Sequence, residues 1–225
     1  MDALIFDFDG VVVDSEPIHL ECFRKVLEGV DLRLSDEDYY AKYLGYDDRD
    51  CFTAVAADGG VAISESRLAK MIAAKTVLVR QAFARAIHPL PGAVDLIRSA
   101  AEADVPLAVC SGALREEIEL ASRTIGVLGQ FRLIVSAEDV SRGKPDPQGY
   151  RLCLERLRAS CRKPLAPSRC LVVEDSPAGI EAARGAGMKV LAVTNSYPRD
   201  QLGQADCIVT SLEGVTIDHL ESLCR

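Results

Sequence analysis

Residues 3–10 read Ala3-Leu4-Ile5-Phe6-Asp7-Phe8-Asp9-Gly10, a short apolar run followed at once by two carboxylates and a glycine. A continuous apolar run of this length is typical of a strand buried on both faces, as in a parallel sheet with helices on either side. Gly10 gives the chain freedom to turn after the acids. The stretch therefore predicts a first, central strand with Asp7 and Asp9 just beyond its end.

Five further runs rich in Val, Leu and Ile have the same character. They are Pro106–Cys110, Leu133–Val135, Leu171–Val173, Val190–Val193 and Cys207–Val209. Segments between them repeat apolar residues at three- and four-residue spacing, which predicts helices at Gly92–Ala103, Leu114–Ile125, Pro147–Arg158 and Pro177–Ala186. This alternation indicates an α/β fold, a Rossmann-like three-layer core with a parallel sheet between helices.

One region interrupts the alternation. From Ser15 to Ala86 the sequence shows successive helical patterns and no convincing strand. We therefore predict a helical cap of residues 15–86, inserted after the first strand of a discontinuous α/β catalytic core of residues 1–14 and 87–225. The two connections, near Gly10–Ser15 and Ile87–Pro91, are expected to act as a hinge for cap opening and closing.

Composition excludes several classes of partner. The net charge of −8 argues against nucleic acid or an anionic membrane, because both require clustered Lys and Arg. The N-terminus has no signal-peptide pattern, so we expect a cytoplasmic protein. The eight cysteines include no Cys-x-x-Cys pair, which favours free, buried thiols over disulfides or zinc.

Polar residues follow four of the predicted strands. Asp7 and Asp9 follow the first and Ser111-Gly112 the second, while Lys144 comes a few residues after the third and Glu174-Asp175 after the fourth. In open parallel sheets, ligands bind outside the carboxyl ends of the strands. We therefore expect these side chains to converge on one site.

Phosphoryl transfer suits this set of residues. A carboxylate repels a phosphate dianion, so Asp7 can attack phosphorus only if a cation and other donors neutralise both partners. Glu174, Asp175, Ser111 and Lys144 are the groups that can arrange this. Hard oxygen ligands of this kind favour Mg²⁺.

Each motif also has an ordinary structural explanation. Asp-Gly after a strand is most often a turn, Ser-Gly is common in loops, and Lys-Pro-Asp is typical of a solvated turn. Glu174-Asp175 at a helix start favours the helix dipole. Four such coincidences in the right order favour a site instead.

The motifs resemble those of the haloacid dehalogenase superfamily. Asp7-Phe8-Asp9-Gly10-Val11-Val12-Val13-Asp14 is similar to its first motif, and Ser111 and Lys144 match the second and third. The stretch from Val173 to Ala183, Val-Glu-Asp-Ser-Pro-Ala-Gly-Ile-Glu-Ala-Ala, resembles the fourth. The resemblance points to the branch of β-phosphoglucomutase and its sugar-phosphate phosphatase relatives.

The resemblance implies a role for each matched residue. Asp7 would be the phosphorylated nucleophile and a Mg²⁺ ligand. Asp9 would be the general acid and then the base, with its backbone carbonyl on the metal. Ser111 and Lys144, with Gly112 beside them, would hold the phosphoryl oxygens, while Glu174 and Asp175 would complete or orient the metal site.

The acceptor of the phosphoryl group distinguishes two activities. Transfer to water makes the enzyme a phosphatase, and transfer to a sugar hydroxyl makes it a phosphomutase. β-Phosphoglucomutase has a Ser-Arg pair in its cap that grips a distal phosphate. Here the corresponding stretch is Leu44-Gly45-Tyr46-Asp47-Asp48-Arg49-Asp50, where the acids beside Arg49 would repel a second phosphate. This favours a phosphatase of a small phosphorylated metabolite, with the phosphomutase as the alternative.

Three cap residues are further candidates for the site. His19 matches a histidine near the general acid in close relatives, and Arg49 and Lys75 are candidate substrate-binding cations. All three are also compatible with ordinary helix positions. The sequence leaves both a monomer and a weak dimer open.

A phosphoryl-accepting receiver domain is a more remote alternative. Receivers also combine an Asp, an acidic pair and a Lys on a parallel sheet. Their acidic pair follows the first strand and their phosphorylated Asp the third, with no cap, so the order here is reversed.

Overall fold

Six parallel strands form a sheet in this computed structural model, which describes residues 1–161 and 164–225. The strands are β1 (Ala3–Phe6), β2 (Leu107–Cys110), β3 (Leu133–Val135), β4 (Cys170–Glu174), β5 (Lys189–Val193) and β6 (Cys207–Val209). Their order is β3-β2-β1-β4-β5-β6, and every neighbouring pair is parallel. The strands that precede the two acidic motifs, β1 and β4, are therefore central neighbours.

The strand residues explain why the sheet is parallel and buried. All four residues of β1 have no exposed surface, and Leu4 pairs with Leu107 on one side and Leu171 on the other. A strand covered on both faces needs apolar residues at consecutive positions, which is the pattern in the sequence. The predicted α/β fold with a parallel sheet and an inserted helical cap is confirmed.

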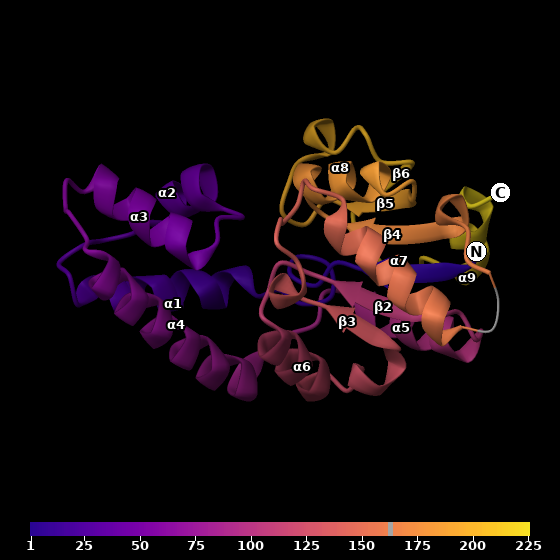
Figure 1. Cartoon of the computed structure of the whole chain (residues 1–225), viewed down its shortest axis with the longest axis horizontal. Helices are drawn as coiled ribbons and strands as arrows, with labels where there is room; N and C mark the ends of the chain where they lie inside the picture. Colours follow the sequence, from indigo (N-terminus) through magenta and orange to yellow (C-terminus); the bar gives the residue numbers. More distant parts are fainter. Residues whose placement is uncertain (162–163) are drawn as a thin grey trace. The chain divides into compact units, whose positions relative to one another are not determined.

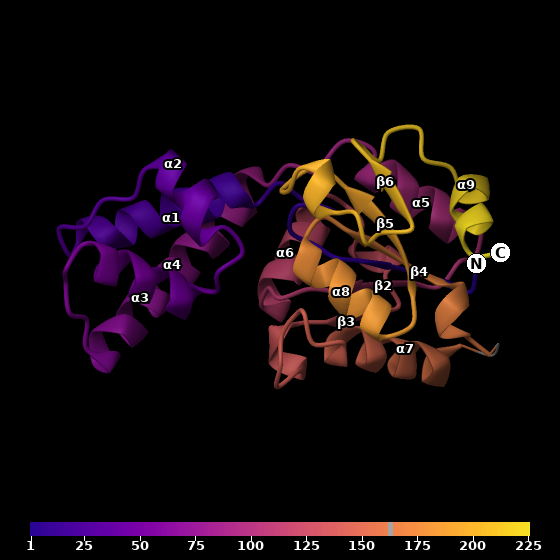
Figure 2. The same cartoon turned by 90° about the horizontal axis from the view of Figure 1, so that it is seen from above.

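Helices cover both faces of the sheet. The helices of the core are α5 (Ala93–Glu102), α6 (Arg115–Thr124), α7 (Gln148–Ser160), α8 (Pro177–Gly185) and α9 (Ile217–Leu223). Short 3₁₀ turns are η2 (Leu128–Gln130), η3 (Ala137–Asp139), η4 (Pro167–Arg169) and η5 (Arg199–Gln201). α7 and α8 lie on one face, and α5 and α9 lie on the other (Figure 2). The sequence pattern did not predict α9, which has only seven residues.

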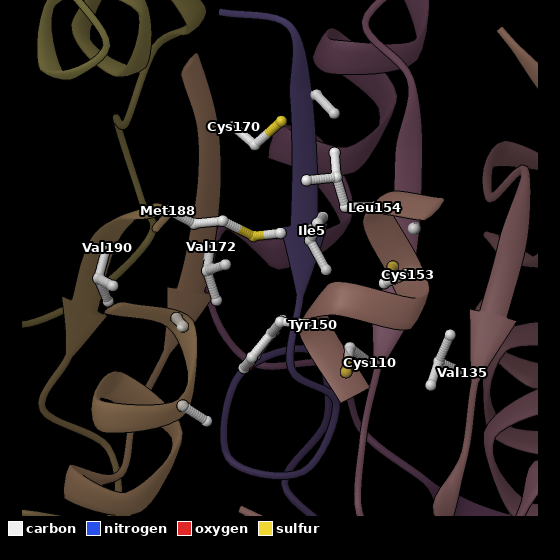
Figure 3. Packing of buried hydrophobic residues seen from close by; sticks show 14 of the residues in the cluster. Ile5, Cys110, Val135, Tyr150, Cys153, Leu154, Cys170, Val172, Met188 and Val190 are labelled. Atoms are coloured by element: carbon white, nitrogen blue, oxygen red, sulfur yellow. The ribbon is translucent and has the colours of Figure 1, made fainter. Parts of the chain in front are cut away.

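The layer between the sheet and α7 is closely packed. Ile5 and Val172 project from β1 and β4 toward Tyr150, Cys153 and Leu154 of α7 (Figure 3). Tyr150 is buried although it is polar, and its hydroxyl donates a hydrogen bond to Glu174 at the sheet edge. This packing places the phenol directly beneath the candidate site.

All eight cysteines are free, as predicted. Six are buried and two are half-buried, so they behave as small apolar side chains. Burial raises the pKa of the Cys110 thiol to about 12. Cys110 is therefore protonated at neutral pH and is no nucleophile, although it precedes Ser111.

The chain divides into two compact units, one of residues 1–14 and 87–225 and one of residues 15–86. The second unit contains α1 (Glu16–Glu28), α2 (Asp36–Asp38), the π-helical turn η1 (Tyr39–Tyr43), α3 (Asp48–Asp58) and α4 (Glu65–Ala86) (Figure 1). It has its own apolar core, in which the rings of Phe23 and Phe52 pack edge to face at 5.0 Å. Among the described helices, none is both long enough and apolar enough to span a bilayer.

Candidate active site

A tight turn carries the first two acids. The N–H of Asp7 still donates to the carbonyl of Val173 at 2.9 Å, so Asp7 lies at the end of the ladder between β1 and β4. The chain then reverses through Gly10, which has a φ of +72° and donates to the carbonyl of Val13 at 2.9 Å. A Cβ on Gly10 would lie 1.9 Å from Asp175 Oδ2. Only glycine fits here, because both the backbone and the space exclude a side chain.

Lys144 joins two of the acidic motifs. It lies in the loop between β3 and α7, and its Nζ is 2.8 Å from Asp7 Oδ2 and 2.5 Å from Glu174 Oε1. Asp7 is 8% exposed and Glu174 is fully buried, so these ion pairs are largely shielded from water. The predicted convergence of the first, third and fourth motifs is present in the structure.

Glu174 has hydrogen bonds to both of its oxygens. Oε1 accepts from Lys144 Nζ and, at 2.8 Å, from the Tyr150 hydroxyl. Oε2 accepts from the N–H groups of Asp175 and Ser176 at 3.0 and 3.1 Å, and from Ser176 Oγ at 3.0 Å. A carboxylate offers about four lone-pair directions, and five donors fill them. Glu174 is thus arranged to hold Lys144 and the start of α8 in place.

Three carboxylates form a group that suits a divalent cation. Asp7, Glu174 and Asp175 each have an oxygen within 4.8 Å of the others, and all three are buried. Lys144 supplies one positive charge against three negative ones. Buried carboxylates in excess of their counterions are stable only if a proton or a cation binds among them. Mg²⁺ prefers such hard oxygen ligands, so the residues present fit this ion.

The pKa shifts of the three clustered carboxylates agree with this excess of negative charge. Burial, opposed by Lys144 and reinforced by Glu174, raises the pKa of Asp7 well above its ordinary value. Burial and the charge of Glu174 raise the pKa of Asp175 to about 7. Burial also disfavours ionised Glu174, but Lys144 and the hydrogen bonds outweigh it and lower its pKa. The raised pKa values of Asp7 and Asp175 thus reflect the excess of negative charge that a bound cation would offset.

Asp9 is half-buried and contacts Ser111, which is buried. Ser111 Oγ donates to Asp9 Oδ2 at 3.5 Å and accepts from the N–H of Ala113 at 3.0 Å. Gly112 is exposed, with open space where a side chain would be. The carboxylate of Asp9 is not part of the group formed by Asp7, Glu174 and Asp175. The side chain of Asp9 thus contacts Ser111 and lies outside the group that could hold a metal ion.

The candidate cations of the cap already have partners within the cap. Lys75 is buried, contacts Asp48, lies 3.0 Å from His19 Nδ1 and stands 3.9 Å above the ring of Phe23. Burial and the charge of Lys75 lower the pKa of His19 well below its ordinary value, so Nδ1 is an acceptor at neutral pH.

Arg49 is exposed on the first turn of α3. Its Nη1 donates to both carboxylate oxygens of Glu65, at 2.9 and 3.2 Å. Its charge is thus matched by a neighbouring acid, as is that of Lys75.

Sequence reasoning missed four residues that contact the site. Tyr150 and Ser176 bind Glu174, while Ser196 donates to Asp175 and Asn195 to the carbonyl of Gly10. Ser176 stands directly after the acidic pair. The last two follow β5, and extending the search along strand ends to the fifth strand would have found them.

A comparison with known protein families covers the part of the chain that carries Asp7, Lys144, Glu174 and Asp175. Residues 4–193 match the model of the haloacid dehalogenase-like hydrolase family. The chain belongs to this family of hydrolases. The resemblance identified from the sequence motifs is therefore confirmed.

Similar proteins include phosphatases and a mutase. The chain is 30% identical to validoxylamine A 7′-phosphate phosphatase from Streptomyces hygroscopicus subsp. limoneus, over 96% of both chains. It is 31% identical to hexitol phosphatase A from Escherichia coli, over 96% of this chain and 93% of the relative. The structure of β-phosphoglucomutase from Clostridium difficile covers 100% of this chain and 97% of that chain, with a TM-score of 0.84 and 20% identity. At that identity the last match shows the shared fold.

Proposed function

We propose that this hydrolase is a Mg²⁺-dependent phosphatase of a small phosphorylated metabolite, a sugar phosphate or a similar monophosphate. The observation that carries the proposal is the ion pairing of Lys144 with Asp7 and Glu174, beside the carboxylate of Asp175, at the carboxyl ends of the parallel strands. Two relatives named as phosphatases, each at least 30% identical over nearly the whole chain, support it.

In the first step, a carboxylate oxygen of Asp7 attacks phosphorus while the bond from phosphorus to the ester oxygen breaks. Asp9 gives its proton to the departing oxygen, which leaves as an alcohol. Lys144 and Ser111 donate to the phosphoryl oxygens and stabilise the charge that develops on them. The product on the enzyme is an aspartyl-phosphate at Asp7.

In the second step, water attacks the same phosphorus and the bond to the Asp7 oxygen breaks. Asp9, now ionised, accepts the proton of the water, and inorganic phosphate leaves. Mg²⁺ held by the carboxylates of Asp7 and Asp175 would supply the positive charge that reduces repulsion between Asp7 and the phosphate. Glu174 keeps Lys144 oriented throughout, because its own lone pairs are already used.

The partners of Arg49 and Lys75, the two candidate cations of the cap, support water as the acceptor of the phosphoryl group. A phosphomutase must hold a second phosphate on its bisphosphate intermediate, which requires an available cation. Arg49 is paired with Glu65, and Lys75 is buried against Asp48. Lys75 could bind a second phosphate only by breaking a buried pair, and Arg49 would have to exchange Glu65 for it, so hydrolysis is favoured over transfer to a sugar hydroxyl.

A phosphate-release screen tests the proposal. Purified protein with Mg²⁺ is offered sugar monophosphates and other metabolite monophosphates, and β-glucose 1-phosphate with a bisphosphate primer is assayed for isomerisation. We expect phosphate release that disappears with Asp7→Ala or on chelation of divalent metal, and that persists in the exposed control Asp200→Asn. Release that survives Asp7→Ala would overturn the mechanism, and isomerisation faster than hydrolysis would replace the phosphatase by a mutase.

A further inference from the structure

A fifth strand end also reaches the acidic cluster. β5 is followed by Thr194, Asn195 and Ser196, and the carboxyl end of β5 lies beside that of β4, which carries Glu174 and Asp175. The catalytic steps above use no group from this loop. Its contacts nevertheless lead directly to the proposed metal ligands.

Two hydrogen bonds connect the loop to the site. Ser196 Oγ donates to Asp175 Oδ2. Asn195 Nδ2 donates to the backbone carbonyl of Gly10 at 2.8 Å. The loop therefore contacts both acidic motifs at once, the carboxylate of the fourth and the turn of the first.

The packing leaves Ser196 little freedom. A Cβ on Gly10 would lie 2.7 Å from Ser196 Oγ and 1.9 Å from Asp175 Oδ2, so these three residues are in close contact. Asn195 anchors the loop to the turn that contains Gly10, and this sets where the Ser196 hydroxyl lies. The hydroxyl is thus directed at one oxygen of one carboxylate by the surrounding backbone.

We propose that Ser196 is a positioning residue for the metal site, which fixes the orientation of the Asp175 carboxylate. The proposal rests on the proposed function, because it takes Asp175 to be a Mg²⁺ ligand. A hydrogen bond to one oxygen defines the plane of the carboxylate and directs the remaining lone pairs. Partners of this kind around metal ligands typically change metal affinity or activity by about 10- to 100-fold when they are removed.

Loss of the Ser196 hydroxyl should therefore weaken the binding of Mg²⁺ more than the binding of the substrate. In Ser196→Ala, Asp175 can turn away from its binding orientation, and its negative charge loses one donor. We expect the dissociation constant for Mg²⁺ to rise by about 10-fold or more. The Mg²⁺ concentration that gives half-maximal activity should rise in parallel, while KM for the phosphorylated substrate at saturating Mg²⁺ should change little.

The test is Mg²⁺ titration of the full chain by calorimetry without substrate. Wild type, Ser196→Ala, Ser196→Thr and the control Ser222→Ala are compared, with folding of each checked by circular dichroism in EDTA. Ser196→Thr keeps a hydroxyl and should restore most of the affinity. Ser222 lies on α9, where its hydroxyl donates to the carbonyl of His219, and its loss should leave Mg²⁺ binding unchanged.

The outcomes separate this inference from the function it rests on. If wild type binds Mg²⁺ and folded Ser196→Ala binds it equally well, the positioning role is wrong while the proposed phosphatase stands. If Ser196→Ala does not fold, Ser196→Gly, which also lacks the hydroxyl, takes its place, and binding of Mg²⁺ by this variant as tightly as by wild type contradicts the positioning role. If wild type binds no Mg²⁺ at all, both the metal site of the proposed function and this inference are overturned.

Discussion

Among the residues that the structure describes, Lys144 is the one cation that contacts two of the three clustered carboxylates directly. Its Nζ lies between Asp7 and Glu174, and their charges raise the pKa of Lys144 above its ordinary range although burial opposes this. A buried charge that loses its partner is far more costly than an exposed one. Lys144 therefore stabilises the carboxylates of the resting protein, and in the proposed mechanism it also stabilises the phosphoryl group during transfer.

Replacing Lys144 by Met should remove both contributions. We expect kcat for phosphate release to fall by about 100- to 1,000-fold, the usual effect of losing one charge-stabilising donor. Steady-state kinetics at saturating Mg²⁺ measures this. Lys189→Met is the matched control, because Lys189 pairs with Asp206 away from the cluster, and its kcat should equal that of wild type. An equal loss in both variants would contradict a specific role for Lys144.

At the residue scale, the sequence predicts the acids better than their hydrogen bonds. Asp7, Glu174 and Asp175 directly follow apolar runs and Lys144 comes a few residues after one, and a parallel sheet must bring strand ends together. No pattern shows that Glu174 is saturated by Tyr150 and Ser176, since that depends on side-chain rotamers in the folded protein.

At the scale of elements, Asp139 connects the end of β3 to two helices. Its Oδ2 accepts from the N–H of Ser136 at 2.9 Å and from Arg115 of α6 at 2.5 Å, and its Oδ1 accepts from Arg156 of α7 at 2.9 Å. Burial alone would raise the pKa of Asp139, but these donors outweigh it and lower the pKa to about 2. The loop that leads from β3 toward Lys144 starts from this anchor.

Asp139→Asn should destabilise the protein in a pH-dependent way. The folded-state pKa is below the unfolded value of 3.8, so the stabilisation is present above pH 3.8 and is lost as pH falls toward 2. We expect the variant to lose about 2 kcal/mol of unfolding free energy at pH 7, measured by urea denaturation. Asp200→Asn should lose less than about 0.5 kcal/mol. An NMR titration of Asp139 with a midpoint near 3.8 would contradict the account.

Within the cap, Lys75 connects several helices, as Asp139 does in the core. It lies on α4 and contacts Asp48 of α3, His19 of α1 and the ring of Phe23, so it joins three helices. Its aliphatic stem fills part of the cap core, and its charge is matched by Asp48. Removing it leaves a cavity and an unpaired acid.

Lys75→Ala should therefore loosen the cap helices. We expect amide hydrogen exchange in α1, α3 and α4 of the full chain to reflect a loss of about 3 kcal/mol in opening free energy, while the core strands are unaffected. Lys70→Ala, at an exposed position of the same helix, is the control and should change exchange little. Equal protection in wild type and Lys75→Ala would show that the contacts of Lys75 contribute nothing to the cap.

At the scale of the whole molecule, the fold follows from patterns that are easy to detect. Six apolar runs and the helical periods between them predict the sheet, because parallel strands buried on both faces need continuous apolar sequence. The apolar runs do not determine the strand order β3-β2-β1-β4-β5-β6, because this order depends on the handedness of the crossovers and on packing. The helix α9 and the π-helical turn Tyr39–Tyr43 also escaped prediction, because short segments have too few residues to show a period.

The central claim is that Asp7 becomes covalently phosphorylated. The most direct test is to quench the enzyme with acid during turnover, reduce it with sodium borohydride, and examine the peptide that contains Asp7 by mass spectrometry. An aspartyl-phosphate is reduced to homoserine, so we predict homoserine at position 7 only when substrate and Mg²⁺ are both present. Homoserine at another acid, or phosphate release by Asp7→Asn at the wild-type rate, would contradict the account.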